Sequence, residues 1–202
     1  MSQLPSYQIR QTLVPREVLY ASEGIITGPI VLDGDRGIDG RSPTQSSDIR
    51  AGWLLGRINA NSRWVPCKRT RVSNANGTGT SFIVVNASPF RVGDVITVGN
   101  DANLTISAIN YSTNSITVST SFTWADAEAV FAQDGSGTCR GVLLDNARLR
   151  NADNTAPSAK GGTLLVQGLV RSDMILGDLT AIRADTGSRL AGVLFTDEQG
   201  LA

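Results

Sequence analysis

The stretch Ala51-Gly52-Trp53-Leu54-Leu55-Gly56-Arg57-Ile58 is typical of a buried β-strand, with a glycine on each side of its apolar trio. A polar turn follows it, and Ser62–Cys67 continues as a second short strand. Segments of matching composition occur only later in the chain, as strand-like runs at Cys139–Leu144, Thr163–Val170 and Arg189–Phe195 and as two helical turns at Asp178–Ala184. The sequence therefore predicts one small β-rich domain made of two separate pieces, residues 49–68 and 137–202.

Residues 69–136, which separate the two pieces, have a different composition. They are dense in Asn, Ser, Thr and short β-branched runs, and they contain few basic residues. Strand-like runs separated by turn residues recur there at Ser81–Asn86, Asp94–Val98, Asn103–Ile109, Ser115–Ser119 and Ala129–Ala132. Within residues 104–108, apolar and hydroxyl side chains alternate, as in a sheet with one face toward water. The pattern predicts a small antiparallel β-barrel or sandwich inserted into a surface loop, because loop tips tolerate insertions whose ends lie close together.

Residues 1–48 are predicted to form an extended N-terminal arm. The segment has scattered single apolar residues, prolines and a glycine-rich run, and it shows no helical period. Only Glu17–Tyr20 and Gly28–Leu32 have the pattern of short strands. Its alternating apolar residues suit a segment that adds a strand to the edge of a partner's sheet. Beyond about Ile25, a strand packed on the chain's own domain is an equal alternative.

The composition argues against several classes of function. Eighteen basic and eighteen acidic residues cancel, so no overall field attracts nucleic acid or an anionic membrane. The N-terminus lacks the pattern of a signal peptide and no apolar run is long enough to cross a bilayer, so we expect a soluble chain made in a cytoplasm. The chain has no histidine, the commonest general base and metal ligand. We therefore expect no enzymatic activity, no metal and no cofactor.

Motifs that resemble functional sites have ordinary structural interpretations. Asp33, Asp35 and Asp39 are interspersed with glycines, but this loop lacks the closing Glu of an EF-hand and is interpreted as a turn. A Ser–Lys catalytic pair would need a buried lysine, and Lys68 and Lys160 are both expected in polar loops with nothing to indicate burial.

Cys67 and Cys139 lie on either side of the inserted segment, so the fold can make them neighbours at its base. A disulfide there is geometrically reasonable, but a reducing cytoplasm favours two free, half-buried thiols. The sequence leaves open whether the two residues meet. Without histidine or other strong ligands they do not make a zinc site.

The two outer pieces together resemble the head decoration protein D family of tailed phages, the lambda type. The residues that carry the resemblance are the strand at 51–58, the Arg63–Pro66 that follows it, Gly141–Asp145, Leu164–Val170 and the terminal Gly192–Phe195. These are patterns of strand and glycine rather than catalytic signatures. The long insertion departs from the simple family pattern and leaves open whether the exposed surface of a trimer carries an additional module.

The resemblance implies a structural protein of the virion, a capsid decoration (cement) protein made in the host cytoplasm. Such a protein binds as a homotrimer to the outer surface of the expanded bacteriophage head and bridges major capsid protein subunits. For this chain we assign the capsid contact to eight apolar residues of the arm: Leu4, Tyr7, Ile9, Leu13, Val14, Val18, Leu19 and Tyr20. We expect the insertion to point away from the capsid, toward neighbouring trimers or a host glycan.

A carbohydrate-binding or adhesin-like β module of a phage tail or cell surface is the alternative from another class. The Asn- and Thr-rich insertion favours it. Its sugar-stacking residues would be Trp124, Tyr111 and phenylalanines of the same segment. Binding to expanded capsids distinguishes the two functions, because an adhesin binds glycans or cells without them.

Overall fold

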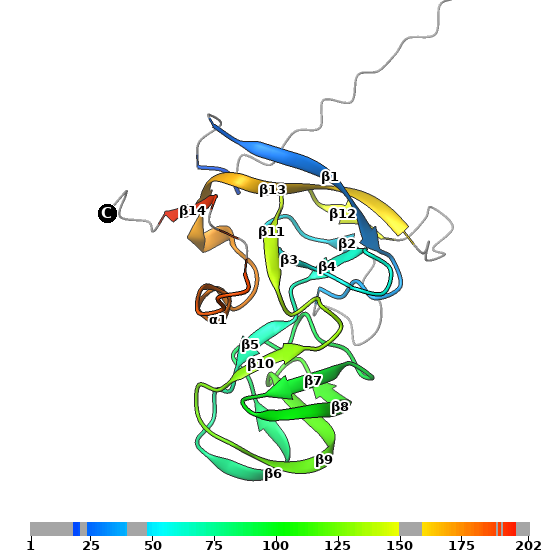
Figure 1. The fold of residues 1–202 in the computed structure, drawn as a ribbon, viewed down its shortest axis with the longest axis vertical. Coiled ribbons are helices and arrows are strands. Elements are labelled where there is room, and N and C mark those ends of the chain that lie inside the picture. The colour runs from blue at the N-terminus through cyan, green and yellow to red at the C-terminus, as the bar shows by residue number, and fades with distance from the viewer. Residues whose placement is uncertain are drawn as a thin grey trace, which may run out of the picture.

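The computed structural model describes residues 18–20, 24–39, 48–149, 159–188, 190 and 192–196. Within these residues the chain is mainly β, with two six-stranded sheets, a two-stranded ribbon and one short α-helix. The two sheets lie one after the other along the longest axis of the molecule (Figure 1). The mainly β fold class predicted from the sequence is confirmed. No helix in the described ranges is both long and apolar enough to span a membrane.

The first sheet is a half-barrel, which we call the body. In spatial order its strands are β1 (Ile26–Asp33), β4 (Trp64–Pro66), β3 (Leu54–Arg57), β11 (Cys139–Leu143), β13 (Ala159–Arg171) and β14 (Val193–Thr196). β1 also pairs antiparallel with β13 along its whole length. Beside the sheet are the ribbon of β2 (Asp48–Ile49) and β12 (Ala147–Arg148), the 3-10 turn η1 (Ser172–Met174) and the helix α1 (Leu179–Arg183). Strands from before and after the insertion therefore share one sheet.

The second sheet is made entirely from residues 69–132 and closes into a small barrel. Its strands, in spatial order, are β5 (Arg69–Arg71), β10 (Ala129–Ala132), β7 (Val95–Val98), β8 (Asp101–Asn110), β9 (Ser115–Trp124) and β6 (Gly77–Ile83). The barrel is closed by the residues that directly follow β5 and β6. Val72 and Val84 form a bridge there, and the Val85 amide donates to the Arg71 carbonyl at 2.9 Å. Closure leaves the sheet without a long unpaired edge.

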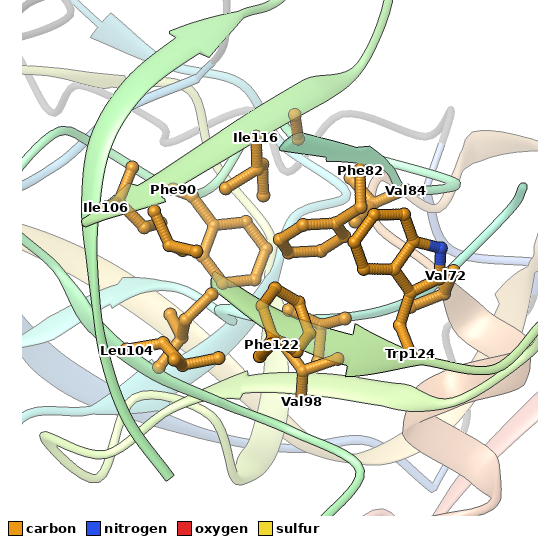
Figure 2. Packing of buried hydrophobic residues seen from close by; sticks show 14 residues of the cluster. Val72, Phe82, Val84, Phe90, Val98, Leu104, Ile106, Ile116, Phe122 and Trp124 are labelled. Carbon is orange, nitrogen blue, oxygen red and sulfur yellow. The ribbon is translucent and has the colours of Figure 1, made fainter. Parts of the chain in front are cut away.

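The barrel folds around its own core because its strands alternate inward and outward residues. In β9, for example, Ile116, Val118 and Phe122 are buried, while Ser119, Ser121 and Thr123 are exposed. Figure 2 shows Phe82, Phe122 and Trp124 gathered at one end of this core. The rings of Phe82 and Phe122 meet edge to face with centroids 5.2 Å apart. The barrel core is separate from the two clusters of buried residues in the body.

The structure corrects the predicted extent of the arm. Residues 24–39 were assigned to an arm that ends at residue 48, but they form β1 and the loop after it, inside the body. Ile30, Leu32 and Ile38 are buried there. Leu32 lies between Lys160 of β13 and Trp64 of β4, so β1 closes one side of the half-barrel. The alternative of a strand packed on its own domain is therefore correct for this segment.

The glycines that flank the apolar trio of residues 53–55 are needed for close packing. A Cβ at Gly56 would collide with the carbonyl of Ser136, in the connection that leaves the barrel. Gly52 has φ +90°, and a Cβ there would collide with the carbonyl of Met174. The glycine pattern that suggested a buried strand thus reflects two points, one before β3 and one within it, where another segment of backbone lies directly against the chain.

Candidate functional site

Residues 18–20 lie beside β13 and extend the body sheet past the start of β1. Leu19 forms an antiparallel bridge with Val170, and the Tyr20 amide donates to the Leu169 carbonyl at 2.9 Å. On the opposite edge of β13, the parallel strand β14 pairs Leu194 with Leu169 and Phe195 with Val170. Three neighbouring segments therefore run side by side at this end of the body.

Paired residues in a sheet point to the same side, so the register sorts these side chains into two rows. Leu19, Val170 and Phe195 form the inner row: Val170 is buried and the other two pack against the same core cluster. The guanidinium carbon of Arg183 also lies 4.8 Å from the centre of the Phe195 ring. This row is part of the body's own core.

Tyr20, Leu169 and Leu194 form the outer row. Tyr20 is 57% exposed and Leu194 is 61% exposed, with the half-buried Leu169 between them. Ile26 of β1 pairs with Gln167, two residues before Leu169 along β13, so its 52% exposed side chain lies on the same side. We call these four residues the outer face: Tyr20, Ile26, Leu169 and Leu194. Apolar side chains gathered on adjacent strands of a small protein mark an interaction surface more often than isolated ones do.

The outer edge of β14 adds backbone groups to this surface. β14 is the last strand in the sheet order, and within the described part of the chain β13 is its sole strand neighbour. An edge of this kind can accept an extended strand from another chain. The outer face and the open edge are therefore suited to a partner that supplies an extended apolar segment.

The structure divides the residues predicted to contact a capsid. Leu4, Tyr7, Ile9, Leu13 and Val14 lie outside the described residues. Val18 is buried and Leu19 packs against the body core, so both stabilise the chain's own fold. Tyr20 alone of the described three is exposed. Leu169, Leu194 and Ile26 were not predicted, because the register that brings them beside Tyr20 is not visible in the sequence.

The barrel is fixed to the body by a buried carboxylate. Asp178, whose side chain is 2% exposed, caps the N-terminus of α1 by accepting the Ala181 amide at 3.0 Å. The same carboxylate accepts from the Arg71 guanidinium at 3.1 Å and from the Thr70 hydroxyl at 3.3 Å, both on β5 of the barrel. One side chain of the body therefore orients both its own helix and the first strand of the barrel.

A second ion pair lies beside the first. Arg69 of β5 reaches Asp185 of the body at 3.1 Å and donates to the Gly137 carbonyl at 2.9 Å. Its guanidinium also lies 4.6 Å from the centre of the Phe131 ring. Three consecutive residues of β5 thus bind the body or the connection to it, which holds the barrel in one orientation.

Lys68 lies in the loop between β4 and β5, but the expectation that it is not buried is wrong. Its side chain is 1% exposed, and its ammonium pairs with the Asp94 carboxylate at 2.7 Å. This burial could not be predicted from the sequence, because the partner of the ammonium lies 26 residues away, directly before β7. Lys160 was also predicted in a loop, but it belongs to a strand, β13, where it lies opposite Leu32 of β1. The ammonium of Lys68 is held in an ion pair with a carboxylate, which does not suit it to act as a base for a serine.

The acidic loop after β1 is a turn, as interpreted from the sequence. Asp33 accepts the Asp35 and Arg36 amides at 3.0 and 2.8 Å. Asp39 is buried and pairs with Arg50. The carboxylates thus face backbone amides and a guanidinium rather than one another. In the described ranges no group of three or more His, Cys, Asp or Glu side chains is arranged to hold a metal ion.

Cys67 and Cys139 are both buried and free, and they meet in the body core. Burial raises the pKa of the Cys67 thiol well above its usual value, and hydrogen bonding to Cys139 raises it further. Since the thiolate is the reactive form, we expect neither thiol to react with Ellman's reagent in the native protein and both to react in guanidinium chloride. Rapid reaction in the native state, or no free thiol in unreduced denatured protein, would contradict this arrangement.

Neither a protein-family model nor a curated protein sequence matches this chain significantly.

Proposed function

We propose that this chain is a phage capsid decoration protein. It attaches as trimers to the outside of the expanded head and bridges major capsid protein subunits through its N-terminal arm. The observation that supports this most strongly is the exposed apolar outer face, which lies where the arm enters the body. The family resemblance of the two outer pieces supports it independently.

The position of Leu19 connects the arm to the outer face. Leu19 is bridged to Val170 and the Arg171 amide donates to the Val18 carbonyl, so the arm, residues 1–17, joins the body at the end of β13 that carries the outer face. A subunit held by the arm is therefore brought against Tyr20 and Leu194. Covering these two side chains removes apolar surface from water, so the outer face adds to whatever affinity the arm supplies.

The orientation of the barrel suits attachment through the opposite end. β1 and β13 lie at one end of the molecule, and β6 and β9 of the barrel lie at the other (Figure 1). The contacts of Arg69 and Arg71 with the body hold the barrel there. With the outer face on the capsid, the barrel extends outward, where it can meet neighbouring trimers or a host glycan.

A cement role needs no catalytic group, and the proposal includes none. Each attached trimer resists the opening of the junction that it spans, because separation of the subunits would break its contacts with them. Contacts of the arm and of the outer face with one shell reinforce one another through effective concentration. Modest contacts are therefore sufficient to stabilise a shell that carries many copies.

The carbohydrate-binding alternative has less support from the barrel. Trp124, Phe82, Phe90 and Phe122 are buried in its core, as Figure 2 shows. Tyr111 packs against that core and donates its hydroxyl to the Phe90 carbonyl at 2.7 Å. Phe131, the remaining aromatic ring of the barrel, lies against Arg69. Tyr111 and Phe131 are half-buried and the other four rings are buried, so the barrel has little exposed aromatic surface for sugar stacking.

The arm and the outer face can be tested separately by co-sedimentation with expanded, undecorated capsids. Deletion of residues 1–17 keeps Val18 and Leu19, and we expect a folded protein that no longer binds. Leu194→Asp places a charge on the outer face, and we expect it to weaken binding at least tenfold, about 1.4 kcal/mol or more. The matched control is Ile83→Asp on the barrel, which is also exposed and should bind normally. Full binding by both the deletion and Leu194→Asp would contradict the proposal.

A further inference from the structure

A notch of about 220 Å³ lies where the barrel meets the body. The turn after β1 forms one side of it, and the segment leading into β7 forms another. Its lining residues are Arg36, Arg91, Gly93, Asp94, Val95, Ala132 and Asp134. Neither the arm nor the outer face contributes to it.

The backbones that carry the two cations of the notch are held in place. The Arg36 amide donates to the Asp33 carboxylate at 2.8 Å, and the other oxygen of that carboxylate accepts from Asn61 at 2.7 Å. The Arg91 amide donates to Asp94 at 2.9 Å, and its guanidinium donates to the Asp35 carbonyl at 3.0 Å. Neither guanidinium forms an ion pair with another described residue, and that of Arg36 makes no hydrogen bond within them either.

The two carboxylates of the notch are already satisfied by other groups. Asp94 is paired with the buried ammonium of Lys68 at 2.7 Å, while its second oxygen accepts the Arg91 amide. Asp134 accepts the amide and the hydroxyl of Ser136 with one oxygen. Two arginines and two aspartates therefore line the notch, and because both aspartates are already bound, the guanidinium groups are the charged groups left to meet an anion.

We propose that this notch binds a small oxyanion, a carboxylate or phosphate group, between Arg36 and Arg91. Guanidinium groups match both anions because their N–H donors can pair with two oxygens at once. Gly93 has no side chain to block the opening, and Val95 and Ala132 give the notch an apolar wall. The buried ammonium of Lys68 balances the charge of Asp94. The source is either free phosphate or the acidic side chain of a protein that meets the junction.

The test is a titration of the full ¹⁵N-labelled protein, followed by the Nε–H signals of Arg36 and Arg91 and the Gly93 amide. Sodium phosphate, sodium acetate and sodium chloride are compared at matched ionic strength. We expect saturable shifts at these three positions with phosphate or acetate and not with chloride. Arg36→Gln should weaken binding about tenfold or more, since it removes the charged hydrogen bonds. Arg148→Gln, an equal change of charge at an exposed residue of β12, should have no effect.

Each result decides the proposal. If phosphate binds more tightly than acetate, the natural ligand of the notch is free phosphate. If acetate binds equally or more tightly, the ligand is an acidic side chain. Shifts that follow ionic strength alone would overturn the site. Binding by Arg36→Gln equal to that of the wild type would also overturn it, provided that the variant keeps the wild-type spectrum elsewhere.

Discussion

Replacing Lys68 with methionine should lower the free energy of unfolding by about 3 kcal/mol, because it leaves the Asp94 carboxylate without its ammonium partner in a largely buried position. Asp94→Asn should also be destabilising, since it leaves a buried ammonium unpaired. The double variant Lys68→Met/Asp94→Asn removes both charges and should recover most of the loss. Urea unfolding of the four proteins gives the coupling energy directly. A double variant whose loss equals the sum of the single losses would show that the pair does not act as a unit.

Replacing Asp178 with alanine should cost a similar amount, about 3 kcal/mol, and should loosen the barrel from the body. The change removes the N-cap of α1, worth about 1 kcal/mol, and leaves Arg71 and Thr70 without a buried charged acceptor. The rate of amide hydrogen exchange should rise in both α1 and β5, although α1 belongs to the body and β5 to the barrel.

Two further variants identify the cause of the Asp178 effect. Asp178→Asn keeps a side chain that can cap the helix but loses the charge, so it should protect α1 while still exposing β5. Asp173→Ala breaks the exposed pair with Arg171, and it should change stability little, because exposed ion pairs contribute little. Faster exchange confined to α1 in Asp178→Ala would mean that the carboxylate caps the helix without holding the barrel.

The barrel could be predicted from the sequence because its strands and turns are each marked by short stretches of neighbouring residues. Apolar and polar residues alternate in runs such as residues 104–108, and turn residues separate the runs. The structure places these runs in β6 to β10, although β6 begins before the predicted run, at Gly77. β5 was missed, because three residues that include two arginines do not have an apolar pattern. Its two arginines form ion pairs with Asp185 and Asp178, which lie more than a hundred residues further along the chain.

The outer face and the notch could not be anticipated, because each depends on contacts between distant residues. Tyr20, Leu169 and Leu194 are unremarkable apolar residues until the register of three segments puts them in one row. The same holds for Arg36 and Arg91, which are brought together only when the barrel is seated on the body. The sequence contains the alternation that makes a strand, but it does not contain the pairing partner of that strand.

Binding of the wild-type protein to expanded, undecorated capsids of its source phage tests the central claim most directly. We expect saturable, stoichiometric co-sedimentation, and we expect the decorated capsids to withstand higher temperatures than bare ones because attached protein opposes the separation of subunits. Absence of binding to intact expanded capsids, with the protein folded and the outer face unmodified, would contradict a capsid decoration function.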